Sequence, residues 1–291
     1  MLRDPEQIVG ELLPLLRCFS PGPCAVGLGG SCAKGHRDAH SDVDVYLFAN
    51  EVRGGAARDA AVVQVLGSDA APVSWGSDEL FVQGGTDFEY RGVRVECWLR
   101  SISSVDAAIA ECLRGEVRRA YVAWTVSGFF NHAVLADVLS LRIVEDAGGV
   151  LARWRGMVAV YPAPLRDSIL RRFMGEAAFW PGNAHYHSAI QRGDVIYTAG
   201  IVQLVVHALV QVLFALNRVY FPGEKLLAES LRRLPVAPRA VPMRMQALLA
   251  PDTPMDVAAL RAQREEVAAL VAEVRELVER DGSRPEGMPT R

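Results

Sequence analysis

The sequence has few cysteines, no paired cysteine motif and no recognisable secretion signal. Its five cysteines are an odd number and include no C-x-x-C pair, so they indicate neither a disulfide framework nor a zinc site. We expect reduced thiols that pack as small apolar side chains in a cytoplasmic protein. The first residues lack the basic-then-apolar order of a signal peptide.

A long apolar run is also missing. The most apolar stretch is Ile201–Leu216, and three polar residues interrupt it, Gln203, His207 and Gln211. A membrane-spanning helix needs roughly 20 predominantly apolar residues. We therefore expect a buried helix of a bundle and no membrane partner.

The chain lacks the basic excess of a nucleic-acid-binding protein. Its net charge is −3, divided into −7 for residues 1–116 and +4 for residues 117–291. A polymerase acting on a template or on tRNA needs a strongly basic surface to neutralise phosphates. This balance predicts no nucleic-acid partner.

What the chain does have is enough apolar residues for a substantial core, at 51% of 291 residues, and a length typical of two domains. A short apolar run that ends at a glycine pair predicts a strand at 24–28, and period-2 alternation predicts strands at 42–48 and, around a turn at Arg91-Gly92, at 88–99, whereas 67–78 is typical of a loop. Helical spacing predicts helices at 6–17, 57–66, 104–114, 131–143, 165–177, 195–217, 224–233 and 255–280. The expected fold class is α+β: a mixed sheet with helices in residues 1–115, an all-helical domain in 116–280, and a flexible tail in 281–291.

One segment carries the chemistry. A short apolar strand ends at Gly29-Gly30, and Ser31 follows as the expected N-cap of a helix, whose backbone N–H groups can hold an anion. On the next strand Asp42 and Asp44 point the same way, because residues i and i+2 share a face. Adjacent carboxylates repel each other and pair with cations, and Mg²⁺ bridging to phosphates fits such oxygen ligands. This arrangement is what phosphoryl or nucleotidyl transfer needs.

A third carboxylate is expected on a neighbouring strand with the same orientation. Glu96 is the candidate, because it lies on an alternating strand whose flanking residues Val95 and Cys97 face the core. Glu89, on the preceding strand, is the alternative. The plain structural interpretation of these residues is a tight turn, a solvated strand end and an ordinary outward-facing glutamate.

This pattern resembles the DNA-polymerase-β-like nucleotidyltransferase superfamily. The superfamily has a Gly-Gly/Ser turn, about ten intervening residues, an Asp-x-Asp between apolar residues and a later carboxylate. Here ten residues separate Ser31 from Asp42. The resemblance covers about residues 22–100.

The resemblance implies two Mg²⁺ ions held by Asp42, Asp44 and Glu96, with Glu96 as general base. It also implies that ATP phosphates bind a set of residues near the glycine turn, namely Gly30, Ser31, Lys34 and Ser41. The otherwise expected role of Lys34 is that of a surface lysine.

The helical half resembles that of two-domain bacterial antibiotic adenylyltransferases and their uncharacterised relatives. There a lysine or tyrosine reaches the triphosphate, a role that the resemblance gives to Lys225 and, with weaker matches, to Tyr220 and Arg192. Asp194 is expected to cap the helix that follows it. The Gln203–His207–Gln211 stripe fits either a substrate pocket or a packed polar seam.

The predicted activity is transfer of AMP from ATP to a hydroxyl of an antibiotic-like small molecule, with release of pyrophosphate, by a monomer or homodimer. The positive helical half disfavours a polycationic aminoglycoside as acceptor, so a less cationic natural product stays open. Two alternatives are an adenylyltransferase acting on a protein side chain and a nucleotide-binding, antitoxin-like regulator.

Overall fold

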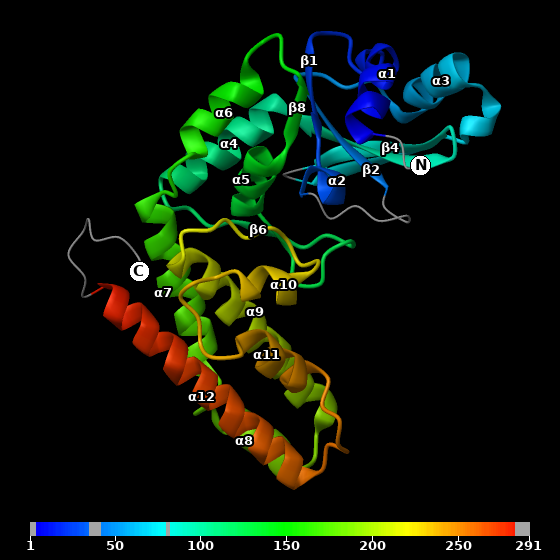
Figure 1. Cartoon of the computed structure of the whole chain (residues 1–291). Coiled ribbons are helices and arrows are strands. Elements are labelled where there is room, and N and C mark those ends of the chain that lie inside the picture. The colour runs from blue at the N-terminus through cyan, green and yellow to red at the C-terminus, as the bar shows by residue number, and fades with distance from the viewer. Residues whose placement is uncertain (1–3, 35–41, 80–81, 283–291) are drawn as a thin grey trace. The chain divides into compact units, whose positions relative to one another are not determined.

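The computed structural model describes residues 4–34, 42–79 and 82–282, which form two compact units (Figure 1). The first unit comprises residues 1–113, 118–122 and 130–160. The second comprises residues 114–117, 123–129 and 161–291. The chain thus passes more than once between the units before it enters the long helical segment.

The first unit is built on a six-stranded mixed sheet. The strands are β1 (Cys24–Leu28), β2 (Val43–Ala49), β3 (Val73–Glu79), β4 (Val82–Tyr90), β5 (Val93–Ser101) and β8 (Arg142–Glu145), in the order β3-β4-β5-β2-β1-β8. β2 and β5 are parallel neighbours, and the other pairs are antiparallel. The sheet therefore brings the two strands expected to carry carboxylates directly together.

One face of this sheet is apolar and covered by helices. The core-facing side chains of β2 and β5 alternate with outward-facing ones, as the sequence pattern predicts, and are fully buried: Val43, Val45, Leu47, Val95, Cys97 and Leu99. Helix α1 (Pro5–Arg17) packs Leu12 against this face, and α3 (Gly55–Leu66) packs Val62. Because strand side chains alternate between the two faces, the burial of these six side chains makes Asp44 and Glu96 project from the other face.

The other face is covered in part by α4 (Ile102–Leu113), α5 (Asn131–Ser140) and α6 (Val150–Val158), which lie together in Figure 1. Phe48 meets Trp154 of α6 edge-to-face, with ring centroids 5.3 Å apart. Arg100, buried at 2% exposure, pairs with Asp137 of α5 at 2.7 Å. These contacts cover the later residues of β2 and β5 and leave Asp44 and Glu96 half-buried.

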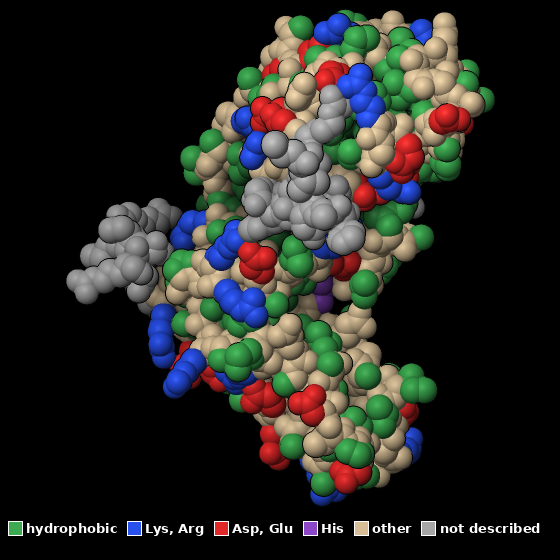
Figure 2. Space-filling model, turned by 45° about the vertical axis from the view of Figure 1, so that its right-hand side comes forward, with side chains coloured by type: hydrophobic (Ala, Val, Ile, Leu, Met, Phe, Trp, Pro, Cys, Tyr) green, Lys and Arg blue, Asp and Glu red, His purple; other side chains and the backbone are tan. Residues whose placement is uncertain are grey.

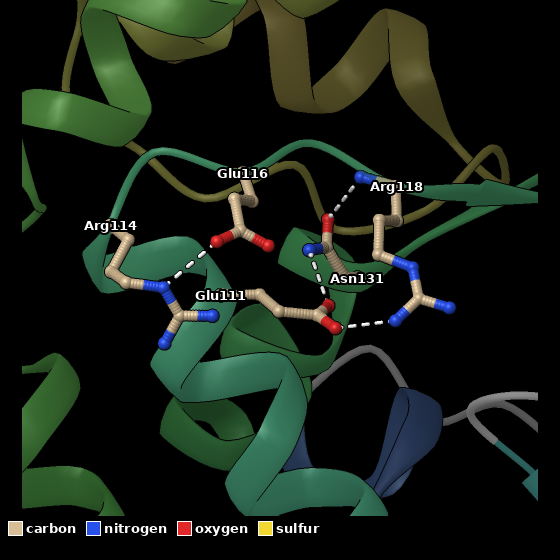
Figure 3. Close-up of polar contacts among 5 residues, drawn as sticks. All are labelled: Glu111, Arg114, Glu116, Arg118 and Asn131. Carbon is tan, nitrogen blue, oxygen red and sulfur yellow. Dashed lines mark hydrogen bonds and ion pairs between the residues drawn. The ribbon is translucent and has the colours of Figure 1, made fainter.

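A buried polar network joins α4 to α5, and Figure 3 shows its side chains. Glu111 of α4 pairs with Arg118 and accepts a hydrogen bond from Asn131 Nδ2 at 3.2 Å. Asn131 Oδ1 accepts from the Arg118 backbone N–H, and the Asn131 N–H donates to the Arg118 carbonyl, both at 3.1 Å. Figure 3 also draws the exposed pair of Arg114 and Glu116, 2.8 Å apart. The short strands β6 (Arg119–Ala120) and β7 (Phe129–Phe130) form a separate two-stranded sheet.

The second unit is helical from residue 161 onward among the described residues. Its helices are α7 (Ala163–Phe179), α8 (Ala184–Gln191), α9 (Val195–Leu216), α10 (Leu227–Arg232), α11 (Val241–Leu249) and α12 (Val257–Gly282). α9 is the central helix and contacts the other five. It is long and apolar enough to cross a membrane, but 72% of its apolar window is buried inside the protein. That burial confirms the expected core helix.

The predicted α+β class and most predicted elements are confirmed. Three expectations were wrong in part. Residues 67–78 are not all loop, because a short 3₁₀ helix (Ser68–Ala70) leads into β3. The segment from 116 is not all-helical, because β8 pairs with β1 in the sheet and so belongs to the first unit. The first two residues of the expected tail are helical, since α12 continues to Gly282, and the rest of the expected tail, 283–291, lies outside the described residues.

Arg58 of α3 is a buried cation behind the sheet, with 5% of its surface exposed. Its guanidinium donates to Thr86 Oγ1 at 2.8 Å, to the Gly85 carbonyl at 3.0 Å and to the Trp75 carbonyl at 3.3 Å. Burial lowers the pKa of this group below its ordinary value. These bonds to two adjacent strands hold β3 against β4.

We expect Arg58→Met to lower the free energy of unfolding of the first unit by about 3 kcal/mol, because the buried acceptors lose charged donors. Urea denaturation followed by tryptophan fluorescence measures this loss. Arg142→Met is the matched control, because Arg142 is 49% exposed and makes one ion pair, with Glu6; its cost should stay below about 1 kcal/mol. Equal costs for the two variants would contradict the role given to Arg58.

Candidate functional site

The glycine turn after β1 packs directly against β2. The Gly29 N–H donates to the Asp44 carbonyl at 2.8 Å. A Cβ added at Gly29 would lie 2.3 Å from Tyr46 Cε2, and one added at Gly30 would lie 1.6 Å from Asp44 Oδ2. Gly30 also has φ +59°, a conformation that side chains disfavour. Both glycines are therefore required sterically, and the turn lies beside the Asp44 carboxylate.

Three carboxylates occupy register positions on neighbouring strands. Asp44 on β2 pairs with Glu96 on β5 in the parallel ladder. Glu96 in turn pairs with Asp87 on β4 in the antiparallel ladder. Because paired residues project from the same face, these side chains share one face of the sheet. Asp42, two residues before Asp44 and just ahead of β2, lies at the same end of the strand. We call Asp42, Asp44, Asp87 and Glu96 the carboxylate face.

A single guanidinium lies between two of these carboxylates. Arg94 donates from Nε to Glu96 Oε1 at 3.3 Å and from Nη2 to Asp87 Oδ2 at 3.1 Å. Trp75 Nε1 donates to the other oxygen, Asp87 Oδ1, at 3.3 Å. Asp87 is thus held from both sides.

The pKa of Glu96 is raised above its ordinary value. Burial is the largest cause, and the negative charges of Asp87, Asp42 and Asp44 add to it, while the hydrogen bond from Arg94 opposes it. Neighbouring carboxylates and partial burial both disfavour the charged form. The positive charge of Arg94 therefore does not fully offset the effect of burial and of the three neighbouring carboxylates on the pKa of Glu96.

Asp87 and Trp75 are site residues that the sequence reasoning missed. The signal for Asp87 was present: a two-residue turn at Arg91-Gly92, where both residues have positive φ, sets Asp87 opposite Glu96. The alternative carboxylate, Glu89, is exposed and lies opposite Arg94 in the register of β4 and β5, two positions beyond Asp87. No sequence signal predicts the position of Trp75, because the Gly, Ser, Asp and Pro residues of 67–78 favour a loop.

Aromatic rings form the next row behind the carboxylates. Tyr46 and Trp98 stack at 6.5 Å with an interplanar angle of 17°, and Trp98 meets Trp75 edge-to-face at 5.1 Å. A Cβ added at Gly85 would lie 2.3 Å from Trp75 Cζ2. The absence of a side chain at Gly85 thus makes room for the Trp75 ring, which carries the hydrogen bond to Asp87.

The predicted phosphate-binding residues are only partly described. Ser31 and Lys34 lie in α2 (Gly30–Lys34). The Gly29 carbonyl accepts a helical hydrogen bond from Ala33, at 3.0 Å, so Gly29 takes the N-cap position and Ser31 does not. Ser41, His36 and His40 lie outside the described residues.

The predicted residues of the second unit are placed as follows. Lys225 is exposed and follows Glu224, whose carboxylate accepts from the backbone N–H groups of Val126 and Ser127, at 2.6 Å each. Tyr220 is 8% exposed and stacks on Tyr161 at 4.6 Å. Glu224 thus anchors the segment that carries Lys225, whereas the Tyr220 ring is a packing element.

The other residues of the second unit singled out by the sequence are either exposed or part of the helical packing. Arg192 is exposed and is the C-cap of α8, and Asp194 caps α9 by accepting from the Tyr197 N–H, at 3.1 Å, which confirms the expected cap. His207 and Gln211 are buried and 3.4 Å apart, whereas Gln203 is exposed. The buried part of the predicted stripe is therefore a packed polar seam.

The donor chemistry of the carboxylate face suits a hard cation, because all of its ligand atoms are carboxylate oxygens. It already accommodates the cationic Arg94 between two of them. Among the described residues, however, no three His, Cys, Asp or Glu side chains converge closely enough to hold a metal ion. The backbone register thus supplies the ligand set, while the side chains are not gathered around one point.

Described side chains of one charge do not cluster on the face of the molecule drawn in Figure 2. On the face drawn in Figure 2, the described basic and acidic side chains are interspersed. A nucleic-acid-binding face would cluster Lys and Arg in one patch or stripe. This face therefore offers no support for a nucleic-acid partner.

The chain is similar to one protein family over part of its length and to a solved structure over most of it. The family described as "Domain of unknown function (DUF4037)" matches residues 130–227, from α5 to the start of α10. Among solved structures, a nucleotidyltransferase-like protein from Exiguobacterium sibiricum is similar, with 12% identity, a TM-score of 0.46, and coverage of 97% of this chain and 82% of that chain. No curated protein matches.

We expect Gly30→Ala to destabilise the first unit more than Gly149→Ala. Both glycines have positive φ, at +59° and +66°, but a Cβ at Gly149 meets nothing within 4 Å. The shared backbone strain costs about 1–2 kcal/mol, and the clash with Asp44 should add about 1–3 kcal/mol. Urea denaturation of both variants measures the difference, and equal losses would show that the turn does not press on Asp44.

Proposed function

We propose that the protein is a Mg²⁺-dependent nucleotidyltransferase that transfers AMP from ATP to a hydroxyl of a small-molecule acceptor. The observation that carries the proposal is the register of Asp44 beside Glu96, with the Gly29-Gly30 turn packed against Asp44. These elements correspond to the Gly-Gly-Ser and Asp-x-Asp motifs by which the sequence resembles the nucleotidyltransferase superfamily, and the strand pairing supports their interpretation as one site.

Asp42, Asp44 and Glu96 are the residues that would hold two Mg²⁺ ions. Bound there, the ions would neutralise phosphate charge and lower the pKa of the acceptor hydroxyl. Two observations support the assignment: all the donor atoms are carboxylate oxygens, and the guanidinium of Arg94 already forms ion pairs on this face. Loss of the ions to a chelator should leave the sheet folded, because its core lies on the other face.

The protein's own groups bind and orient the reactants. Backbone N–H groups at Gly30 and Ser31, with Lys34 and Ser41, bind the phosphates of ATP. Glu96 accepts the proton of the acceptor hydroxyl as general base. The acceptor oxygen then bonds to the α-phosphorus, the bond from that phosphorus to the β-phosphate oxygen breaks, and pyrophosphate leaves.

Residues of the second unit complete the proposal. Lys225 is exposed on an anchored segment and is proposed as a phosphate contact. We also propose Arg192, which is exposed, as a weaker contact; for Tyr220, whose ring is packed on Tyr161, the proposal is limited to its hydroxyl group. The positive net charge of residues 117–291 supports an acceptor that is not polycationic, such as a neutral or weakly basic natural product.

Asp44→Asn should abolish turnover while the fold stays intact. Asn keeps the shape of the side chain but removes the charge that a cation needs, and loss of a group acting in the transition state costs on the order of a thousandfold or more. Mg²⁺-dependent binding of a non-hydrolysable ATP analogue tests binding. Pyrophosphate release with a panel of hydroxylated acceptors tests the reaction. A folded, active Asp44→Asn protein would refute the site. Wild-type nucleotide binding without turnover would favour a regulatory binder.

Glu96→Gln and Glu89→Gln separate the two glutamates that the sequence offered. Glu96→Gln should lose activity to a similar extent, because it removes both a base and a metal ligand. Glu89→Gln should retain wild-type activity, because Glu89 is exposed and lies away from Asp44 in the register. Steady-state rates of the two variants decide the matter, and the reverse pattern would transfer the role to Glu89.

A further inference from the structure

Arg94 is the one described guanidinium placed between members of the carboxylate face. It lies on β5 two residues before Glu96 and therefore on the same face of the strand. Its side chain is 52% exposed, whereas those of Glu96 and Asp87 are 25% and 21% exposed. The cation is thus solvent-accessible, while the anions that it contacts are largely enclosed.

The contacts of Arg94 are those of a bridging cation. Its Nε and Nη2 atoms reach carboxylates on two different strands, Glu96 at 3.3 Å and Asp87 at 3.1 Å. Asp87 is the better-fixed partner, because Trp75 Nε1 also donates to it, at 3.3 Å. Glu96 contributes only its Oε1 atom to the bridge.

Arginine can perform this task at all ordinary pH values, because its guanidinium does not lose its proton. Carboxylates in adjacent register positions repel one another when no cation is near. A metal ion bound by Glu96 would compete with Arg94 for the negative charge of the same carboxylate. It would also be repelled by the guanidinium charge. Arg94 and a metal ion are therefore two competing ways to neutralise Glu96.

We propose that Arg94 is an internal counter-ion of the carboxylate face, which takes the place of a divalent cation at Glu96 and is displaced from it when the cation binds. The inference rests on the proposed function for its metal. Asp87 is the positioning residue of this device, because its second hydrogen bond, from Trp75, keeps it in place to hold Arg94 after Glu96 is released.

A double-mutant cycle in EDTA tests the counter-ion without any metal. Arg94→Met should lower the melting temperature by about 2–4 °C. In a Glu96→Gln background it should lower the melting temperature less, because the charge that it neutralises is gone. Arg153→Met is the matched control: Arg153 is 49% exposed and pairs with Asp106 at 2.9 Å, so its effect should be the same in both backgrounds. Equal effects of Arg94→Met in both backgrounds would overturn the proposal.

Mn²⁺ titration followed by electron paramagnetic resonance tests the competition. Arg94→Met should bind Mn²⁺ about three- to tenfold more tightly than wild type, since the guanidinium charge no longer competes for Glu96 or repels the ion. Arg94→Lys, a point charge that cannot bridge two carboxylates, should fall between them, and Arg153→Met should match wild type. Unchanged or weaker Mn²⁺ binding by Arg94→Met would overturn the proposal. If neither protein binds Mn²⁺ but the EDTA cycle shows coupling, the proposed function and the displacement of Arg94 both fail, and only the neutralisation of Glu96 by Arg94 stands.

Discussion

The parallel pairing of β2 with β5 is the constraint on which the carboxylate face depends. It sets Asp44 beside Glu96, and the buried valines and leucines of both strands enforce that register. A slip by one residue would turn Glu96 into the core and a buried side chain out to solvent, which is prohibitively costly. Packing on one face of the sheet therefore determines the electrostatics of the other.

The glycine turn and the β3–β4 pair complete the face from its two sides. On one side, Gly30 allows the chain to run within contact distance of the Asp44 carboxylate. On the other, Gly85 makes room for the Trp75 ring, whose N–H group fixes Asp87. In both places the missing side chain of a glycine decides where a carboxylate lies, so these positions tolerate substitution poorly for a geometric reason.

Much of this arrangement could be predicted from the sequence, and the rest depends on long-range pairing. Alternation alone placed Asp44 and Glu96 on outward faces, and helical spacing placed α9 in a core. β3 escaped prediction because its segment is rich in Gly, Ser and Asp, and it forms a strand through hydrogen bonds with β4. The short strand β8 pairs with β1, more than a hundred positions away, which no local pattern reveals. Ser31 lost its expected N-cap position because the Gly29 carbonyl accepts the first helical bond.

Two arginines contact β4 from opposite faces, and their surroundings give them opposite characters. Arg58 is 5% exposed and donates to neutral oxygens of Thr86, Gly85 and Trp75. Because water is excluded there, loss of these bonds would leave buried polar groups unpaired, so Arg58 is a permanent part of the fold. Arg94 is 52% exposed and donates to carboxylates. Water can replace each of its bonds at little cost, so only Arg94 can exchange its place for a cation, and the sheet between them keeps the two roles apart.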